Sequence, residues 1–305
     1  MCTAVCLRGK DCFFGRTLDL AVTYGEEVVV TPRRARLWGI PEESHHAIIG
    51  VAHVEGAQAL YYDAVNECGL ACAALRFPRY AVYAPWREGG VPSFALLPWV
   101  LGRAATLAEA RVLLQGVRIT DEAAAPHLPA TPLHWILADK TGVVTVESRE
   151  TGLEILENPL GVLTNAPPFL HQCSFAERYV HLSPYPQGEA GDTGTVGLPG
   201  DFGSLSRFAR AAYVAKHTVR GENTAPSDFF HLMEAVSLPR GAVLTAQGQP
   251  VCTQYTSLAD TARGIYYFTT YANRRIRAVS LENKPLDGDE ILRYTMDGAE
   301  EIRYL

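Results

Sequence analysis

A cysteine stands second in the sequence, directly after the initiator methionine. Because a small residue follows Met1, we expect an aminopeptidase to remove it and leave Cys2 as the N-terminus. One residue then carries both a thiol and a free α-amine, two groups that ordinarily ionise near pH 8. An amine that takes the proton of the thiol makes this residue a nucleophile with its own base. The alternative is a buried, inert cysteine that happens to occur early in the chain.

Two charged residues, Arg16 and Asp19, follow closely enough to share a site with the N-terminal cysteine. Strand-like patterns at 3–8 and 12–16 flank a plausible hairpin turn at 9–11. An antiparallel return of the chain brings Arg16 back beside the thiol, and Asp19 lies three residues further on. For both charges the alternative is a buried ion-pair network that only stabilises the fold.

The composition is that of a globular protein with ample residues for a packed core. The 305 residues are 48% hydrophobic and 20% charged, with a net charge of −6. A negative chain without a basic patch is not typical of nucleic-acid binding. We see no signal peptide and no apolar run that approaches the roughly 18 residues of a membrane span. Seven cysteines, an odd number, then predict reduced thiols in a cytoplasmic protein.

The predicted secondary structure runs from strands to two helices, then strands, two helices and strands again. Strands are predicted at 3–8, 12–16, 26–31, 47–54, 58–62, 70–75, 133–138, 142–148, 152–156, 161–164, 252–257, 265–271, 275–281 and 291–295. Helices are predicted at 91–101, at 106–114 behind the capping-box pattern Thr106-Leu-Ala-Glu109, at 203–217 and at 226–236. The stretches 117–131 and 184–205 read as surface loops. Runs of each type, without strict alternation, predict one α+β domain over residues 1–305.

The signatures of several common enzyme classes are absent. The sequence has no Walker loop, Gly-x-Ser-x-Gly elbow, His-Glu-x-x-His pair or dinucleotide fingerprint. Cys68 and Cys72 lack the second ligand pair that a zinc site needs. No histidine, including the adjacent His45 and His46, stands in a context that indicates a Cys–His protease. The N-terminal segment therefore remains the strongest candidate for chemistry.

Several ordered segments together resemble the choloylglycine hydrolase family of N-terminal-nucleophile hydrolases, which holds bile salt hydrolases and penicillin V acylases. They extend from residue 2 to the final strands and include Cys2, Gly15-Arg16-Thr17-Leu18-Asp19, Asn66-Glu67-Cys68-Gly69-Leu70, Leu133-His134-Trp135, Leu163-Thr164-Asn165, Gly200-Asp201-Phe202 and Ser206-Arg207-Phe208. A full-length resemblance is far more specific than one cysteine and favours the catalytic interpretation of Cys2. It implies a four-layer αββα sandwich with two antiparallel sheets between helical layers.

The resemblance also implies a role for each matching residue. Cys2 is the nucleophile and its α-amine the general base, while Arg16 is an active-site arginine that favours the ionised sulfur. Asp19 binds and orients the α-amine. Asn165 is the oxyanion-hole asparagine, and Arg207 is a second active-site arginine. Neither a cofactor nor a metal is implied.

The substrate that the resemblance favours is a bile acid conjugated to glycine or taurine. Many bile salt hydrolases have Asn, and penicillin V acylases tend to have Tyr, where this chain has Arg76, but the segment 77–81 is closer to bile salt hydrolases. The Arg76 side chain either pairs with the carboxylate or sulfonate of the conjugate or points outward. Its backbone N–H can serve the oxyanion hole in either case. We expect the steroid in a pocket near Leu20, Tyr61 and residues 117–134.

Two other functions remain open at this point. One is a penicillin V acylase or another N-acyl amide hydrolase with a smaller acyl pocket. The other is a family member without activity that binds amphipathic acids, although all five expected catalytic residues are present. The resemblance also suggests a homotetramer.

Overall fold

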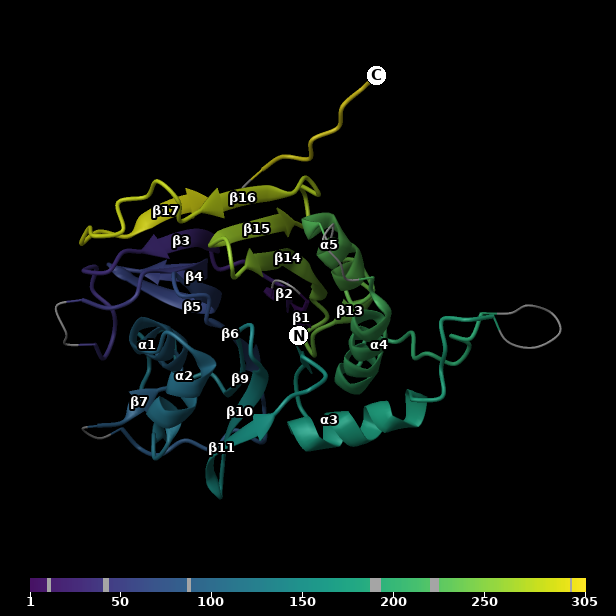
Figure 1. Ribbon diagram of the computed structural model, residues 1–305, viewed down its shortest axis with the longest axis horizontal. Helices are drawn as coiled ribbons and strands as arrows, with labels where there is room; N and C mark the ends of the chain where they lie inside the picture. Colours follow the sequence, from purple (N-terminus) through teal and green to yellow (C-terminus); the bar gives the residue numbers. More distant parts are fainter. Residues whose placement is uncertain (10–11, 41–43, 87–88, 187–192, 220–224, 297) are drawn as a thin grey trace.

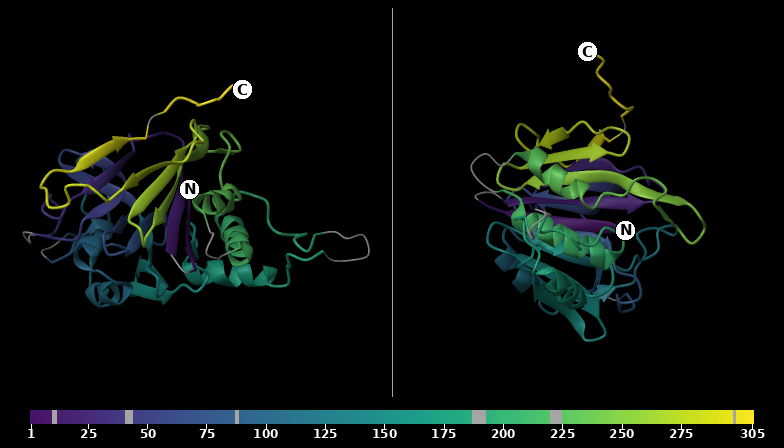
Figure 2. Two further views of the ribbon diagram at one scale, coloured as in Figure 1. Left: turned by 45° about the horizontal axis from the view of Figure 1, so that its top comes forward. Right: turned by 90° about the vertical axis from the view of Figure 1, so that its right-hand side faces the viewer.

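Two antiparallel β-sheets lie face to face between two layers of helices (Figure 1). The structure, a computed structural model, describes residues 1–305 except 10–11, 41–43, 87–88, 187–192, 220–224 and 297. The predicted four-layer αββα class is thereby confirmed. Two of the three residues of the predicted turn at 9–11 lie outside the described residues. The C-terminal residues extend away from the body beyond the last strand (Figure 2).

The sheet that carries the N-terminus has the strand order β12-β1-β2-β14-β15-β16, with β13 paired to β14. These strands are β12 (Val162–Leu163), β1 (Cys2–Arg8), β2 (Cys12–Leu20), β14 (Pro250–Asp260), β15 (Ile265–Thr270), β16 (Arg277–Ser280) and β13 (Val243–Leu244). The two N-terminal strands are thus central, paired with each other and flanked by strands from much later in the chain. A strand with neighbours on both sides is held more rigidly than an edge strand.

The second sheet has the order β11-β10-β9-β6-β5-β4-β3-β17. Its strands are β11 (Gly152–Glu157), β10 (Val143–Arg149), β9 (Leu133–Ala138), β6 (Ala71–Arg76), β5 (Gln58–Asn66), β4 (Ile48–Glu55), β3 (Glu27–Thr31) and β17 (Leu292–Thr295). A small parallel pair joins β7 (Val91–Pro92) to β8 (Ile119–Thr120). The predicted strands are present, although β2 and β5 extend four residues beyond their predicted ends. The β7–β8 pair was not predicted: β7 lies in the segment predicted as the start of helix 91–101, and β8 lies in the predicted loop 117–131.

The helices cover the outer faces of both sheets (Figure 1). They are α1 (Leu96–Arg103), α2 (Leu107–Leu114), α3 (Phe169–Ala176), α4 (Ser204–His217) and α5 (Pro226–Glu234), with a short 3₁₀ turn at Glu177–Tyr179. Helix α1 packs on the second sheet, and α4 and α5 pack on the first. The predicted cap of α2 is confirmed, since the Thr106 side chain accepts a hydrogen bond from the Glu109 N–H at 3.2 Å. Helix α3 was not predicted, because it buries only Phe169 and Gln172 and so shows little amphipathic pattern.

Alternation along the strands divides the apolar residues into two cores. On β6, Ala71, Ala73 and Leu75 face the first sheet. Cys72 and Ala74 point the other way and pack with α1. The inner face of β6 lies opposite the N-terminal strand β1. None of the described helices is both long enough and apolar enough to cross a lipid bilayer.

Gly15 permits the close approach of β2 and β14. A Cβ atom at this position would lie 1.9 Å from the carbonyl oxygen of Ser257. Because backbone atoms on both sides would have to move, we expect Gly15→Ala to lower the free energy of unfolding by about 3 kcal/mol. Gly200→Ala is the control, since no atom lies within 4 Å of its added Cβ. Urea unfolding of both variants tests this, and equal stabilities would contradict the close-approach explanation.

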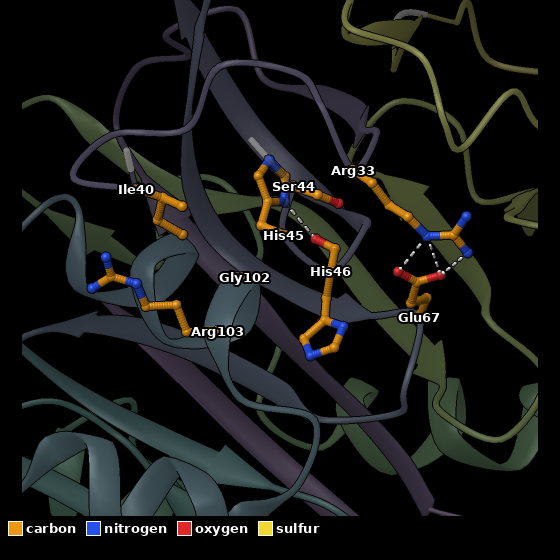
Figure 3. Close-up of a pocket in the computed structure, with 8 residues that line it drawn as sticks. All are labelled: Arg33, Ile40, Ser44, His45, His46, Glu67, Gly102 and Arg103. Carbon is orange, nitrogen blue, oxygen red and sulfur yellow. Dashed lines mark hydrogen bonds and ion pairs between the residues drawn. The ribbon is translucent and has the colours of Figure 1, made fainter. Parts of the chain in front are cut away.

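A pocket of about 420 Å³ opens beside α1, lined by Arg33, Ile40, Ser44, His45, His46, Glu67, Gly102 and Arg103 (Figure 3). No predicted site residue lines it. The Arg33 guanidinium is paired with the Glu67 carboxylate at 2.5 Å. Both ring nitrogens of His45 contact backbone carbonyl groups, those of His46 and Ala35. The polar lining is therefore largely engaged in holding the loop in place.

Candidate active site

The β1–β2 hairpin brings Cys2 and Arg16 onto one face, while Asp19 points by alternation to the other. Cys2 pairs with Leu18, and Ala4 pairs with Arg16, so all four side chains point toward the second sheet. Cys2 is buried. The predicted return of Arg16 to the vicinity of Cys2 therefore agrees with the register, since the Ala4–Arg16 pair is the next one on the same face, two positions from the Cys2–Leu18 pair.

The Arg16 guanidinium reaches across the inter-sheet space to the backbone of the second sheet. Its Nη1 donates to the carbonyl oxygens of Tyr62, at 2.9 Å, and Ala74, at 2.6 Å. Tyr62 precedes Asp63 and Ala74 follows Ala73, so both carbonyl groups lie next to the Asp63–Ala73 pair of the antiparallel β5–β6 ladder. Nη2 has no hydrogen-bond partner among the described residues. Because Nε also donates to the Thr17 carbonyl oxygen, at 3.3 Å, the guanidinium is anchored through two nitrogens and Nη2 is left over.

Electrostatics keep Arg16 charged although it is completely buried. Burial by itself would lower its pKa, but Cys2 foremost, then Tyr255 and Asp63, raise the pKa above its ordinary value. A permanent cation beside the thiol stabilises a thiolate more than a thiol. The position is therefore suited to the ionisation of Cys2.

Tyr61, predicted to line the substrate pocket, does not face the site. Its side chain packs in the core beneath α1, and its hydroxyl lies 2.7 Å from the Thr31 hydroxyl. The cause is a β-bulge, since Val51 pairs with Asp63 while Ala52 pairs with Tyr61, leaving Tyr62 as an extra residue. The bulge turns Tyr62 toward the inter-sheet core and Tyr61 away from it. The prediction for Tyr61 is therefore wrong, and Tyr62 is the residue near the site.

Asn165 joins three parts of the chain around the first peptide group. Its Oδ1 accepts hydrogen bonds from the backbone N–H of Cys2, at 2.7 Å, and from Arg207 Nη2, at 3.0 Å. Its Nδ2 donates to the carbonyl oxygen of Arg76 at 2.9 Å. The amide orientation is well determined, because Oδ1 faces two donors and Nδ2 faces an acceptor.

Arg207 connects α4 to the N-terminal strand. Its Nη1 donates to the Cys2 carbonyl oxygen at 2.5 Å and to the Thr3 hydroxyl at 2.6 Å. The side chain is fully buried, and burial lowers its pKa, while Asp19 and Cys2 act in the opposite direction. The planar fork of an arginine holds several acceptors in a fixed geometry, which a lysine cannot do. Arg207 thus fixes the backbone of Cys2 relative to α4.

Asp19 lies beside the amino terminus. Its backbone N–H donates to the Met1 carbonyl oxygen at 2.9 Å, and the Met1 amine donates to the Asp19 carbonyl oxygen. Its carboxylate accepts from the Thr253 hydroxyl at 2.8 Å. Burial raises the pKa of the carboxyl group, and Arg207 and the terminal amine oppose that rise. A buried carboxylate near the terminus is suited to bind an ammonium group.

Because its pKa is raised, the ionised Asp19 carboxylate lowers the stability of the folded protein at neutral pH. A carboxyl group whose pKa is higher in the folded state contributes stability at low pH and loses it as the pH rises through the folded-state pKa. Asp19→Asn cannot ionise, so we expect a higher thermal midpoint than wild type at pH 7 and a smaller difference at pH 4. Turnover should fall by about 100-fold. Thermal melts at both pH values test this, and a lower midpoint at pH 7 would contradict it.

The remaining predicted contacts lie at the edge of the site. Leu20 ends β2 on the same face as Arg16 and packs partly buried against the inter-sheet core. Arg76 ends β6 with an exposed side chain, on the face that alternation assigns to α1. Its carbonyl oxygen, in contrast, is bonded to Asn165. The backbone of Arg76 lies at the site, whereas its side chain begins on the opposite face.

Several residues that hold the site had no recognisable pattern in the sequence. The Ser204 hydroxyl accepts from the Asn165 N–H at 3.0 Å, and Gln172 Nε2 donates to the Asn165 carbonyl oxygen at 2.7 Å. His134 Nε2 lies 2.8 Å from the carbonyl oxygen of Thr164, the residue before Asn165. Only His134 stood in a segment that resembled the family.

Comparisons with known proteins identify the family of this chain. Residues 2–294 match the family described as linear amide C–N hydrolases, choloylglycine hydrolase family. A bile salt hydrolase/transferase of Lactiplantibacillus plantarum is 36% identical over 97% of both chains. One of Clostridium perfringens is 31% identical over the full length of both.

Solved structures extend the similarity to three dimensions. The C2A mutant of the conjugated bile acid hydrolase from Clostridium perfringens superposes with a TM-score of 0.92, at 31% identity over 100% of both chains. The penicillin V acylase of Agrobacterium tumefaciens gives 0.77, at 24% identity over 95% of this chain and 90% of that one, which shows a shared fold. This chain belongs to the choloylglycine hydrolase family of linear amide C–N hydrolases.

Proposed function

We propose that this protein hydrolyses the amide bond of glycine- or taurine-conjugated bile acids, with Cys2 as the nucleophile. The observation that carries the proposal is the convergence on one peptide group. Asn165 and Arg207 bind the backbone of Cys2, and Arg16 lies on the same face as its thiol. Relatives at 31–36% identity along the whole chain are bile salt hydrolase/transferases.

The reaction begins after removal of Met1, which turns the Cys2 amide nitrogen into an α-amine. This amine takes the proton of the thiol, and Asp19 beside it stabilises the resulting ammonium. The sulfur attacks the amide carbonyl, and the ammonium protonates the nitrogen of the leaving glycine or taurine. Water, deprotonated by the amine, then cleaves the thioester and releases the bile acid.

We assign two N–H donors to the oxyanion of the tetrahedral intermediate. A primary amide has two hydrogens, and Asn165 gives one of them to the Arg76 carbonyl oxygen. The other serves the oxyanion. The Arg76 N–H is the second donor. Since Phe77 N–H donates to Pro132 on the β9 side, the Arg76 N–H points the other way, toward Asn165.

We assign two substrate contacts, Leu20 and Arg76, from their positions at the edge of the site. Leu20 lies on the thiol side of β2 and contributes to the apolar wall for the acyl group. The exposed Arg76 guanidinium is long enough to bend over the rim of the site and pair with the carboxylate or sulfonate of the conjugate.

The test is amine release from glycocholate, taurocholate and penicillin V, after intact mass has established that Met1 is absent. We expect fast release from at least one bile conjugate and slow release from penicillin V. The reverse ranking would assign the protein to the penicillin V acylases. No release from any of the three would leave only the fold and the family membership.

We also propose that the protein assembles as a homotetramer and is located in the cytoplasm. The seven cysteines are all free thiols, as expected where thiols are kept reduced. Light scattering on the purified protein tests the tetramer, and fractionation of the producing cells tests the compartment.

A further inference from the structure

The carboxylate of Asp63 is buried between the sheets and was not among the predicted site residues. It lies on β5 and is 1% exposed. Three hydroxyl groups of the opposite sheet donate to it: Tyr255 to Oδ1 at 2.6 Å, Ser257 to Oδ2 at 2.8 Å, and Tyr266 to Oδ2. This is the environment of an ionised carboxylate, which accepts hydrogen bonds and donates none.

Ser257 links this carboxylate to Arg16. The backbone N–H of Arg16 donates to Ser257 Oγ at 3.2 Å, and the hydroxyl hydrogen of Ser257 points to Asp63. The link depends on the tight contact of β2 with β14 that Gly15 allows. The backbone of Arg16 and the carboxylate are therefore held in one hydrogen-bonded unit.

Arg16 and Asp63 each favour the charged form of the other without forming an ion pair. Among the residues that the structure describes, no carboxylate lies within ion-pair distance of Arg16. Burial raises the pKa of Asp63, and Arg16 is the strongest influence that lowers it. In the low-dielectric interior, opposite charges interact appreciably beyond contact distance.

Separation of the charges has a chemical advantage. A carboxylate in direct contact with Arg16 would occupy hydrogens of the guanidinium and cancel its field at the sulfur. Held away by three hydroxyl groups, Asp63 compensates the buried cation while Nη2 keeps no partner among the described residues. The cation then remains effective toward Cys2.

We propose that Asp63 is a positioning residue, the counter-charge that balances Arg16 from a distance and so sets how readily the Cys2 thiol ionises. The proposal rests on Cys2 being the nucleophile of the proposed function. The titratable and charged groups around this pair are the terminal amine, Cys2, Arg16, Asp19, Tyr62, Asp63, Cys72, Arg207, Tyr255 and Tyr266. Of these, Asp63 is the carboxylate between the sheets.

The test is the pH dependence of Cys2 alkylation by iodoacetamide in the processed protein, read from the mass of the N-terminal peptide. Asp63→Asn removes the counter-charge and leaves Arg16 in place, so we expect the midpoint to move to lower pH by about 0.5 unit. That corresponds to a roughly threefold larger thiolate-to-thiol ratio at a given pH. Asp139→Asn is the matched control, a buried carboxylate with several donors at the Arg8 end of β1, opposite to Cys2, and should leave the midpoint unchanged.

If Asp63→Asn does not fold, the double variant Tyr255→Phe with Tyr266→Phe replaces it. This variant leaves Asp63 one hydroxyl donor and favours its neutral form, so the midpoint should again move to lower pH. An unchanged midpoint, or a move to higher pH, would overturn the proposal. Because alkylation needs no substrate, a shift in a protein that fails to hydrolyse bile conjugates would reject the proposed substrate and retain the role of Asp63.

Discussion

Cys2→Ala is expected to lower the hydrolysis of conjugated bile acids by at least about 10⁴-fold, because no other group in the site replaces the sulfur as nucleophile. The fold should persist. The hydrogen bonds of Cys2 to Asn165 and Arg207 use its backbone N–H and carbonyl oxygen, which alanine retains. Amine release and a thermal melt on the same preparation measure both effects.

Two further variants sharpen this experiment. Cys2→Ser keeps the shape of the side chain, but its hydroxyl ionises far less readily than a thiol, so turnover should remain severely reduced. Cys72→Ala removes another buried thiol, in the core beneath α1, and should lower stability while preserving turnover. Turnover by Cys2→Ala near the wild-type rate would reject Cys2 as the nucleophile.

Asn165→Asp is expected to lower kcat by roughly 100- to 1,000-fold, the usual effect of losing one oxyanion-hole donor. The substitution is selective. An aspartate still offers an oxygen to the Cys2 N–H and to Arg207, but it replaces the donor side of the amide by a second acceptor. The nucleophile should therefore stay oriented while the oxyanion loses its donor. Steady-state kinetics on the best bile conjugate measure kcat and KM.

Asn158→Asp is the matched control for this variant. Asn158 is also buried, and its amide donates to the Thr145 hydroxyl and the Val162 carbonyl oxygen. We expect its replacement to lower stability and to leave the kcat of the folded protein close to wild type. If both variants lose kcat equally, the effect of Asn165→Asp reflects general disruption. If Asn165→Asp keeps kcat within about threefold, the oxyanion role is wrong.

Features set by neighbouring residues were predictable from the sequence. The N-terminal hairpin, most strands and the capped helix α2 depend on period-two patterns, turn residues and a Thr–Glu spacing. The placement of Cys2, Arg16 and Asp19 follows from the same hairpin. The family resemblance added Asn165 and Arg207, which no local pattern connects to the first residue.

Only the tertiary structure decided which side chains meet at the site. Asp63 faces Cys2's side of the second sheet, and Tyr61 does not, because a bulge at Tyr62 reverses the alternation between them. A bulge depends on how β5 pairs with β4, and that pairing leaves no mark in the nine residues of β5. The hydroxyl groups that hold Asp63 come from strands about 190–200 positions later in the chain. Local periodicity assigns a residue to a strand, but its charge environment is made by the packing of two sheets, which is a property of the whole chain.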